Sequence, residues 1–465
     1  MEKGRLYIRN AMILALVNIL LRGEAVSFNG YVSGKIGAES MGLFTLVMSI
    51  YGFAVTLATS SVHLAAVRLT AERCARLEGA DVGSYRKTVR QILWAVCRYS
   101  LLFGCSAAVL LFTLSQPIAR YLLNDMRTLS SLRVLAVSLP AIALSSALGG
   151  YFTGMRKIGK NAVMTLFEQA AKFSITATAL VCVVPTGSVE HMCLAVVGGS
   201  ACAEALSLVL AAVFYLTDSR IPKGDRAGVG RKVLTTGFGD AASISFPIAV
   251  GAYARQGLVT AEHLAIPWGL KRSGATQTEA LEAYGVLQGM ALPVILFPYA
   301  VIGAFTGILI PEITALNAVG KTETLKKLCG KVLRTAGWFS LVSFAVFFCF
   351  AGPLGSGIYH SAEAGTYIRR LAFLVPFMYI DTVTDALLKG LGEQLYCMKV
   401  NIADAFVSLV LVVIFTPTMG LGGYVLSMYA CEIMNLGLSV YKLWDRLEKE
   451  PEKQKIPGSL QNQGS

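Results

Sequence analysis

Long apolar stretches separated by short polar segments run along almost the whole chain. A helix needs about 20 mainly apolar residues to cross a bilayer, and twelve stretches approach that length. They lie at roughly 10–32, 41–65, 92–115, 133–154, 162–184, 192–216, 237–260, 283–309, 335–352, 370–389, 399–417 and 421–442. Prolines inside several of them suit membrane helices, because neighbouring helices satisfy the carbonyls that a proline leaves free. The pattern predicts an all-α polytopic membrane protein with twelve transmembrane helices.

The composition supports this class of protein. Of the 465 residues, 55% are hydrophobic and 15% are charged, whereas soluble globular proteins are about 25% charged. A water-facing surface on a chain of this length would need more charge, so most soluble classes are excluded. The sequence has no HExxH motif and no cluster of cysteine and histidine, so we expect no metal site of that kind.

The positions of the positive charges predict the orientation. The chain has 41 Lys and Arg against 28 Asp and Glu, a net charge of +13. With a cytoplasmic N-terminus and twelve alternating crossings, the inner segments hold 29 of the 41 basic residues, the outer segments 8 and the spans 4. Basic residues in short loops stay cytoplasmic, so we expect a plasma-membrane protein with both termini in the cytoplasm. Anionic lipid attracts this charge, and no nucleic-acid partner is needed to explain it.

The two halves of the chain resemble each other. Shifts of 236 and 228 residues align polar, glycine and proline positions: Pro140 with Pro376, Gly154 with Gly390, Glu168 with Asp404, and Glu204 with Glu432. Both halves start on the cytoplasmic side, which is typical of a parallel repeat about an axis along the membrane normal. We therefore predict two pseudo-symmetric six-helix bundles, residues 1–225 and 226–443, around a central cavity. A polar, disordered cytoplasmic tail is expected over residues 444–465.

Two arginines are candidates for substrate binding. Arg22 lies in the first span beside Glu24, and Arg255 lies in the seventh span. A shift of 233 places the two arginines at equivalent sites of the two halves. A charge inside a membrane span usually faces a cavity or a partner, and the planar guanidinium binds phosphate with two parallel hydrogen bonds. Two such groups would suit a pyrophosphate. The alternative is that Arg22 pairs with Glu24 or another acid as a structural link.

A second candidate site is one for a coupling cation. Asp240 opens the seventh span, and Asn401 and Asp404 lie three residues apart on one face of the eleventh. Carboxylate and amide oxygens are hard ligands that suit a small cation, and a carboxylate can also carry a proton. These three residues predict a site for Na⁺ or H⁺. The alternative is that they form hydrogen bonds between helices.

Two segments carry a resemblance to a known family. KIGAESMGLFTLVMSIYGFAVTLATSSV (35–62) and AYARQGLVTAEHLAIPWGLKRSGATQTEALEAYGVLQGMALPVILFP (252–298) resemble the stage V sporulation protein B family. That family belongs, with the MurJ-type lipid II flippases, to the multidrug/oligosaccharidyl-lipid/polysaccharide exporter superfamily. The resemblance extends over most of residues 8–440.

The resemblance implies a V-shaped pair of bundles that moves a polyprenyl-pyrophosphate-linked saccharide across the membrane. Cavity arginines of the MurJ type imply substrate contacts for Arg22 and Arg255, with Glu24 as the neighbouring acid. The MurJ-type sodium site, on helices seven and eleven, implies roles for Asp240 and Asp404. MurJ-type proteins have fourteen helices, the last two of which help to hold the lipid tail, whereas this sequence predicts twelve.

The sequence therefore favours a transporter over an enzyme. The leading hypothesis is a flippase for lipid II or a polysaccharide precursor, active in cell-wall (peptidoglycan) or polysaccharide biosynthesis or in sporulation. Its partners would be the lipid-linked saccharide and membrane lipids, and we expect a monomer without a cofactor, coupled to Na⁺ or H⁺. One alternative is a cation-coupled multidrug exporter of the same superfamily. The other is a membrane glycosyltransferase, which would need a larger extramembrane segment than the sequence offers.

Overall fold

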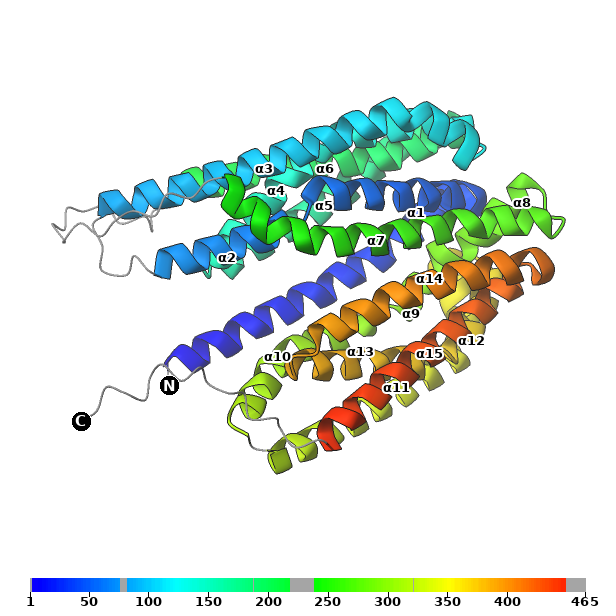
Figure 1. Ribbon diagram of the computed structural model, residues 1–465. Helices are drawn as coiled ribbons and strands as arrows, with labels where there is room; N and C mark the ends of the chain where they lie inside the picture. Colours follow the sequence, from blue (N-terminus) through cyan, green and yellow to red (C-terminus); the bar gives the residue numbers. More distant parts are fainter. Residues whose placement is uncertain (1, 76–81, 187, 218–237, 321, 449–465) are drawn as a thin grey trace, which may run out of the picture.

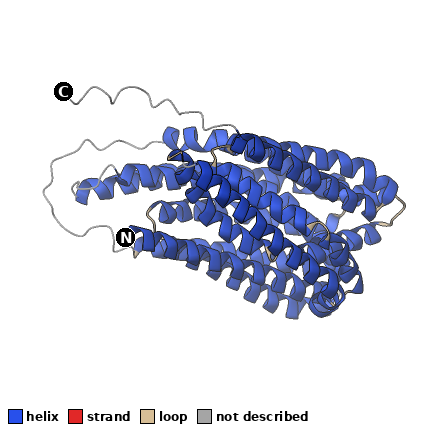
Figure 2. Ribbon diagram, turned by 90° about the horizontal axis from the view of Figure 1, so that it is seen from below, coloured by secondary structure: helices blue, strands red, loops and turns tan. Residues whose placement is uncertain are grey.

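The computed structural model describes residues 2–75, 82–186, 188–217, 238–320 and 322–448. All regular structure in these ranges is helical (Figures 1 and 2). The α-helices are α1 Glu2–Thr59, α2 Val62–Ala75, α3 Val82–Pro117, α4 Leu129–Gly154, α5 Ile158–Val183, α6 Val189–Leu216, α7 Phe238–Arg272, α8 Gln277–Tyr284, α9 Leu292–Ile295, α10 Tyr299–Ala318, α11 Thr322–Tyr359, α12 Ala362–Ala372, α13 Val375–Gly390, α14 Gln394–Met419 and α15 Leu421–Glu448. Two π-helical segments, η1 (Ile118–Leu122) and η4 (Gly285–Ala291), and two 3-10 segments, η2 (Met126–Thr128) and η3 (Val184–Thr186), complete them.

Helix α1 contains a reversal of direction at Gly37. This residue has φ 77° and ψ 174°, outside the helical region, and glycine reaches such a φ without the clash that a Cβ causes. Figure 1 shows that the part of α1 before the reversal and the part after it run in opposite directions. The reversal separates the first two predicted spans, 10–32 and 41–65.

The helices pack in two groups that follow the two halves of the sequence. In the first half α4 packs against α2, α3 and α6, and α5 packs against α6. In the second half α13 packs against α10, α11 and α15, and α14 packs against α15. The same pattern of neighbours thus recurs in the order that the internal repeat predicts. In Figure 1 these groups lie above and below the first part of α1.

The sequence predicts twelve spans. Fewer helices of the described structure qualify as spans when they are judged by length and apolar composition alone. The described residues contain eight helical segments that qualify, or nine if α12 and α13, bent by 54°, form one span. One of the eight, Leu16–Arg73, includes the reversal at Gly37 and counts once. Helices α7 and α15 carry polar residues in their middles, such as Arg255 and Glu432, which lower their hydropathy. The count of twelve therefore stays a prediction.

The C-terminal boundary needs a correction. The tail was expected to begin at residue 444, but α15 continues to Glu448. Leu443 is buried and the helix carries its apolar face past the predicted end of the span, which explains the longer helix. The remaining residues, 449–465, and the expected junction of the bundles at 225–226 lie outside the described residues.

The two halves touch closely at the end of the molecule that holds the Gly37 reversal. Gly42 on α1 lies against the backbone of α8 and η4, so that a methyl group on Gly42 would overlap the Leu281 carbonyl oxygen. A methyl group on Gly285 would likewise lie 2.6 Å from the backbone nitrogen of Gly42. Only residues without a Cβ allow the two backbones to approach this far, so the two glycines form a tight seam between the halves.

Candidate transport site

Arg22 lies on the first part of α1, at the boundary between the two groups of helices. Its side chain is exposed, and it forms no ion pair with any acid in the described part of the chain. The next residue, Gly23, faces the second half, because a Cβ there would lie 3.6 Å from the ring of Phe297. An arginine without an acidic partner on a helix between two bundles is available to an anion.

Arg255 lies at the middle of α7 and is also exposed. It shares a helix face with Gly251 and Glu262, four and seven residues away. A Cβ at Gly251 would lie 3.3 Å from Met398 of α14, so this face points toward α14. The guanidinium acts electrostatically on the Asp404 carboxylate of α14, but the two groups form no salt bridge in the described structure.

Glu24 forms an ion pair with a lysine of another helix. The Lys172 Nζ of α5 lies 3.9 Å from Glu24 Oε1, and about a fifth of each side chain is exposed. Lys172 also lies 4.6 Å from the ring centre of Phe28, a cation–π contact. The predicted alternative in which Glu24 pairs with Arg22 is therefore not the arrangement seen. The carboxylate neutralises Lys172 and leaves Arg22 free.

A polar cluster lies deeper in the first half. The Tyr51 hydroxyl of α1 donates to Glu204 Oε2 of α6 at 2.8 Å and lies 2.6 Å from Ser138 Oγ of α4. Glu204 and Glu168 line a cavity of about 440 Å³ together with His63. The cluster brings together three helices that the sequence separates widely.

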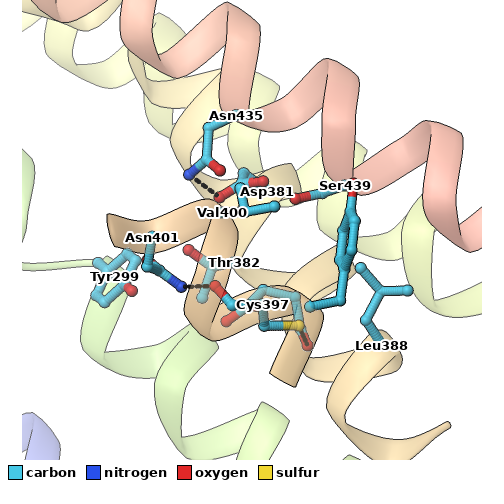
Figure 3. Close-up of a pocket in the computed structure, with 11 residues that line it drawn as sticks. Tyr299, Asp381, Thr382, Leu388, Cys397, Val400, Asn401, Asn435 and Ser439 are labelled. Atoms are coloured by element: carbon cyan, nitrogen blue, oxygen red, sulfur yellow. Dashed lines mark hydrogen bonds between the residues drawn. The ribbon is translucent and has the colours of Figure 1, made fainter. Parts of the chain in front are cut away.

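A second polar cavity, of about 90 Å³, lies in the second half between α10, α13, α14 and α15 (Figure 3). Asp381 is 8% exposed. Its Oδ2 accepts a hydrogen bond from Asn435 Nδ2 at 3.1 Å, whereas its Oδ1 is buried without a hydrogen-bond partner among the described atoms. Asn401 lines the same cavity, and its amide nitrogen donates to the Cys397 carbonyl oxygen at 2.7 Å (Figure 3).

The structure does not bring Asp240 to Asn401 and Asp404. Asp240 pairs with Arg73 at the end of α2, at 3.7 Å. On α7, Gly251 is the residue that lies beside Met398 of α14. Asp240 comes eleven residues before Gly251, and these residues correspond to about 16 Å along the helix axis. Helices α7 and α14 run parallel, so Asn401 and Asp404 lie further along still. The two helices that carry the predicted residues, α7 and α14, pack together, but Asp240 lies at a different level from Asn401 and Asp404.

Several residues of these clusters were not predicted as site residues: Tyr51, Ser138, Lys172, Tyr299, Asp381, Asn435 and Ser439. One signal for the second cavity was present, because Asp381 and Asp385 lie four residues apart and thus on one helix face. Asp385 is engaged by Lys389 at 2.5 Å. For Tyr51 no signal existed, since a single tyrosine in an apolar stretch says nothing of its partners.

The fold defines a class of protein. It is a multi-pass helical membrane protein built from two packed halves, and solved MATE transporter structures share this fold. One solved structure is described as the inward-facing conformation of a multidrug resistance MATE family transporter. Its alignment with this chain covers 94% of this chain and 98% of that one, with a TM-score of 0.71 and 12% identity. The outward-facing conformation of such a transporter gives a TM-score of 0.56 at 15% identity, over 94% of this chain and 93% of that one. The TM-score is thus higher against the inward-facing structure than against the outward-facing one.

The sequence gives the family. Residues 7–247 match the polysaccharide biosynthesis protein family, and the chain belongs to this family. It is also 23% identical over 425 residues to stage V sporulation protein B of Bacillus subtilis (strain 168), which covers 90% of this chain and 80% of that protein. The resemblance expected from residues 35–62 and 252–298 is confirmed by these matches.

Proposed function

We propose that the protein is a flippase that moves a polyprenyl-pyrophosphate-linked saccharide, such as lipid II or a polysaccharide precursor, from the inner to the outer leaflet. The family supports a role in polysaccharide biosynthesis, and the fold supports an exporter that works by alternating access. The observation that carries the substrate class is the pair Arg22 and Arg255. Both are exposed on predicted spans without a salt bridge to a described acid, and guanidinium groups are suited to phosphate oxygens.

In this mechanism the inward-facing state admits the pyrophosphate between the halves. Arg22 on α1 and Arg255 on α7 hold it, and Glu24 keeps Lys172 neutralised so that the charge at the boundary comes from the two arginines. The tight seam at Gly42 and Gly285 closes the opposite end. Rocking of the two halves then opens that seam and closes the inner side, which exposes the saccharide to the outer face.

We propose that a coupling cation, Na⁺ or H⁺, acts at the cavity of Asp381. The donors fit such a cation, because the buried Asp381 Oδ1 has no partner in the described structure and amide and hydroxyl oxygens of Asn401, Tyr299 and Ser439 line the same space. Asp404 lies on the same helix as Asn401 and links this region to Arg255. Asp240 takes no part, since its carboxylate pairs with Arg73.

The wider expectations extend the proposal. The protein would reside in the plasma membrane as a monomer with both termini in the cytoplasm and with bundles bounded near residues 225–226. The relatedness to a sporulation protein makes a cell-wall precursor made during sporulation a reasonable substrate. In such a protein the residues of interest bind and release a lipid, and no covalent step is needed.

The test is flipping of a fluorescent lipid-linked saccharide in proteoliposomes. Arg22→Ala and Arg255→Ala should each abolish flipping, while Arg98→Ala, at another exposed arginine within a span, should retain it. Asp381→Asn should remove the dependence of the rate on a Na⁺ or H⁺ gradient. Unchanged flipping in both arginine variants would refute the substrate site. Export of organic cations by the wild-type protein, without flipping, would instead establish the multidrug exporter.

A further inference from the structure

An open apolar groove lies at the boundary of the two halves, away from Arg22. It has a volume of about 330 Å³ and is lined from the first half by residues of α1, of η1 and of the turn after η1, and from the second half by residues of α7, α8 and α14. Its walls are mainly aliphatic and aromatic, and they include Leu46, Leu122, Leu264, Pro267 and Val413. The groove lies near the turns that follow α3 and α7, the end that the charge distribution places outside.

Each side of the groove carries an arginine stacked on an aromatic ring. The Arg120 guanidinium lies 5.7 Å from the ring centre of Tyr121, on the first half. The Arg272 guanidinium lies 4.8 Å from the ring centre of Trp268, on the second half. Both rings line the groove, and they are 69% and 41% exposed. Tyrosine and tryptophan beside a basic group are typical of the membrane–water interface.

The rim of the groove has an excess of positive charge. Lys271 lines the groove, and neither it nor Arg120 or Arg272 forms an ion pair with a described acid. The acid that follows on the next helix, Glu279, is committed to its own helix, because it accepts hydrogen bonds from the Thr276 backbone nitrogen at 2.8 Å and hydroxyl at 2.9 Å. One basic side chain therefore lines the groove, two more lie over aromatic rings that line it, and none of the three is paired with a described acid.

We propose that this groove binds an anionic phospholipid. The phosphate lies among Lys271, Arg272 and Arg120, and one acyl chain lies along the apolar walls. Such a lipid contacts both halves, so its binding depends on how far the halves are apart at this end. The inference needs only that the protein spans a membrane, and it does not depend on the flippase proposal.

Trp268 provides a direct readout, because it lines the groove and is one of four tryptophans. The experiment uses the full chain with the other three replaced by phenylalanine, reconstituted in nanodiscs that contain brominated phosphatidylglycerol or brominated phosphatidylcholine. Bromine quenches tryptophan only at short range. A single-tryptophan variant that keeps Trp338, which is 67% exposed on α11, is the matched control.

Phosphatidylglycerol should quench Trp268 at a several-fold lower mole fraction than phosphatidylcholine, and Trp338 should show no preference. Lys271→Gln should reduce the preference by about fivefold, the effect of one basic side chain at an anionic surface, and adding Arg120→Gln should reduce it further. Equal quenching by the two lipids would show an apolar groove without a phosphate site and would overturn the proposal. Quenching by neither lipid, as a covering protein partner would produce, would overturn it as well.

Discussion

Replacing Gly42 with alanine should shift the protein out of the inward-facing conformation. The added methyl group would overlap the Leu281 carbonyl oxygen and lie 2.8 Å from its carbon, whereas ordinary contact begins at 3.4 Å. The helices would therefore have to separate by more than the 0.6 Å that the carbon alone requires, because the Leu281 oxygen is the nearer atom. Overpacking of this kind costs about 1–3 kcal/mol, which corresponds to about 5- to 150-fold in the ratio of the two conformations. In the proposed transport cycle the seam opens in the outward-facing state, so that state would escape this cost.

The shift can be measured as a distance at the opposite end. Val163 on α5 and Leu395 on α14 are 50% and 70% exposed, and spin labels at these positions report the separation of the halves in a background without native cysteines. Gly42→Ala should add a population with a shorter distance than the wild type. Gly337→Ala, where a methyl group meets nothing within 4 Å, should leave the distribution unchanged. Identical distributions for Gly42→Ala and the wild type would refute the role of the seam.

Three further predictions concern stability, measured by chemical unfolding in mixed micelles. Tyr51→Phe should lower the free energy of unfolding by about 1–3 kcal/mol, because the buried Glu204 carboxylate loses its 2.8 Å donor; no change would contradict the hydrogen bond. Lys172→Met should destabilise by a similar amount, since it leaves Glu24 without its cation. Adding Glu24→Gln should recover most of that loss, and additive losses would argue against the pair. Asp125→Ala should cost about 0.5–2 kcal/mol, because Asp125 caps the 3-10 segment that follows it, and an unchanged unfolding curve would show that the cap is dispensable.

The fold was largely predictable because membrane helices consist of long apolar stretches, which can be recognised in the sequence. The predicted stretches lie on helices, and the spacing of Pro140 and Pro376 pointed to the repeat that the packing of α4 and α13 now shows. The prediction for residues 283–309 was the least accurate. It was expected as one span, but the chain is π-helical over Gly285–Ala291 and turns before Tyr299. Hydropathy does not register such a break, because the residues of the π-helical segment and of the turn after it are apolar apart from Gln288.

The candidate site was predictable only in part. Arg22 and Arg255 stand out because a charge is unexpected in an apolar run, and both lie on helices at the boundary of the halves. Whether a charged residue finds an ion-pair partner depends on tertiary packing. Glu24 is an example: its neighbour in the sequence is Arg22, yet its ion-pair partner is Lys172, about 150 residues away. The register of α7 against α14 likewise separated Asp240 from Asn401.

The sequence by itself determined that this chain crosses a membrane many times, that its halves are related, and that a few charges lie where lipid would exclude them. These properties depend on the free energy of transferring side chains from water to hydrocarbon. Each residue type has its own value, so the sequence alone is enough to read them. Only the tertiary structure decided which of those charges are neutralised. Coulomb attraction falls with distance, so the rotation and register of packed helices leave Arg22 and Arg255 free and commit Glu24 and Asp240 to partners.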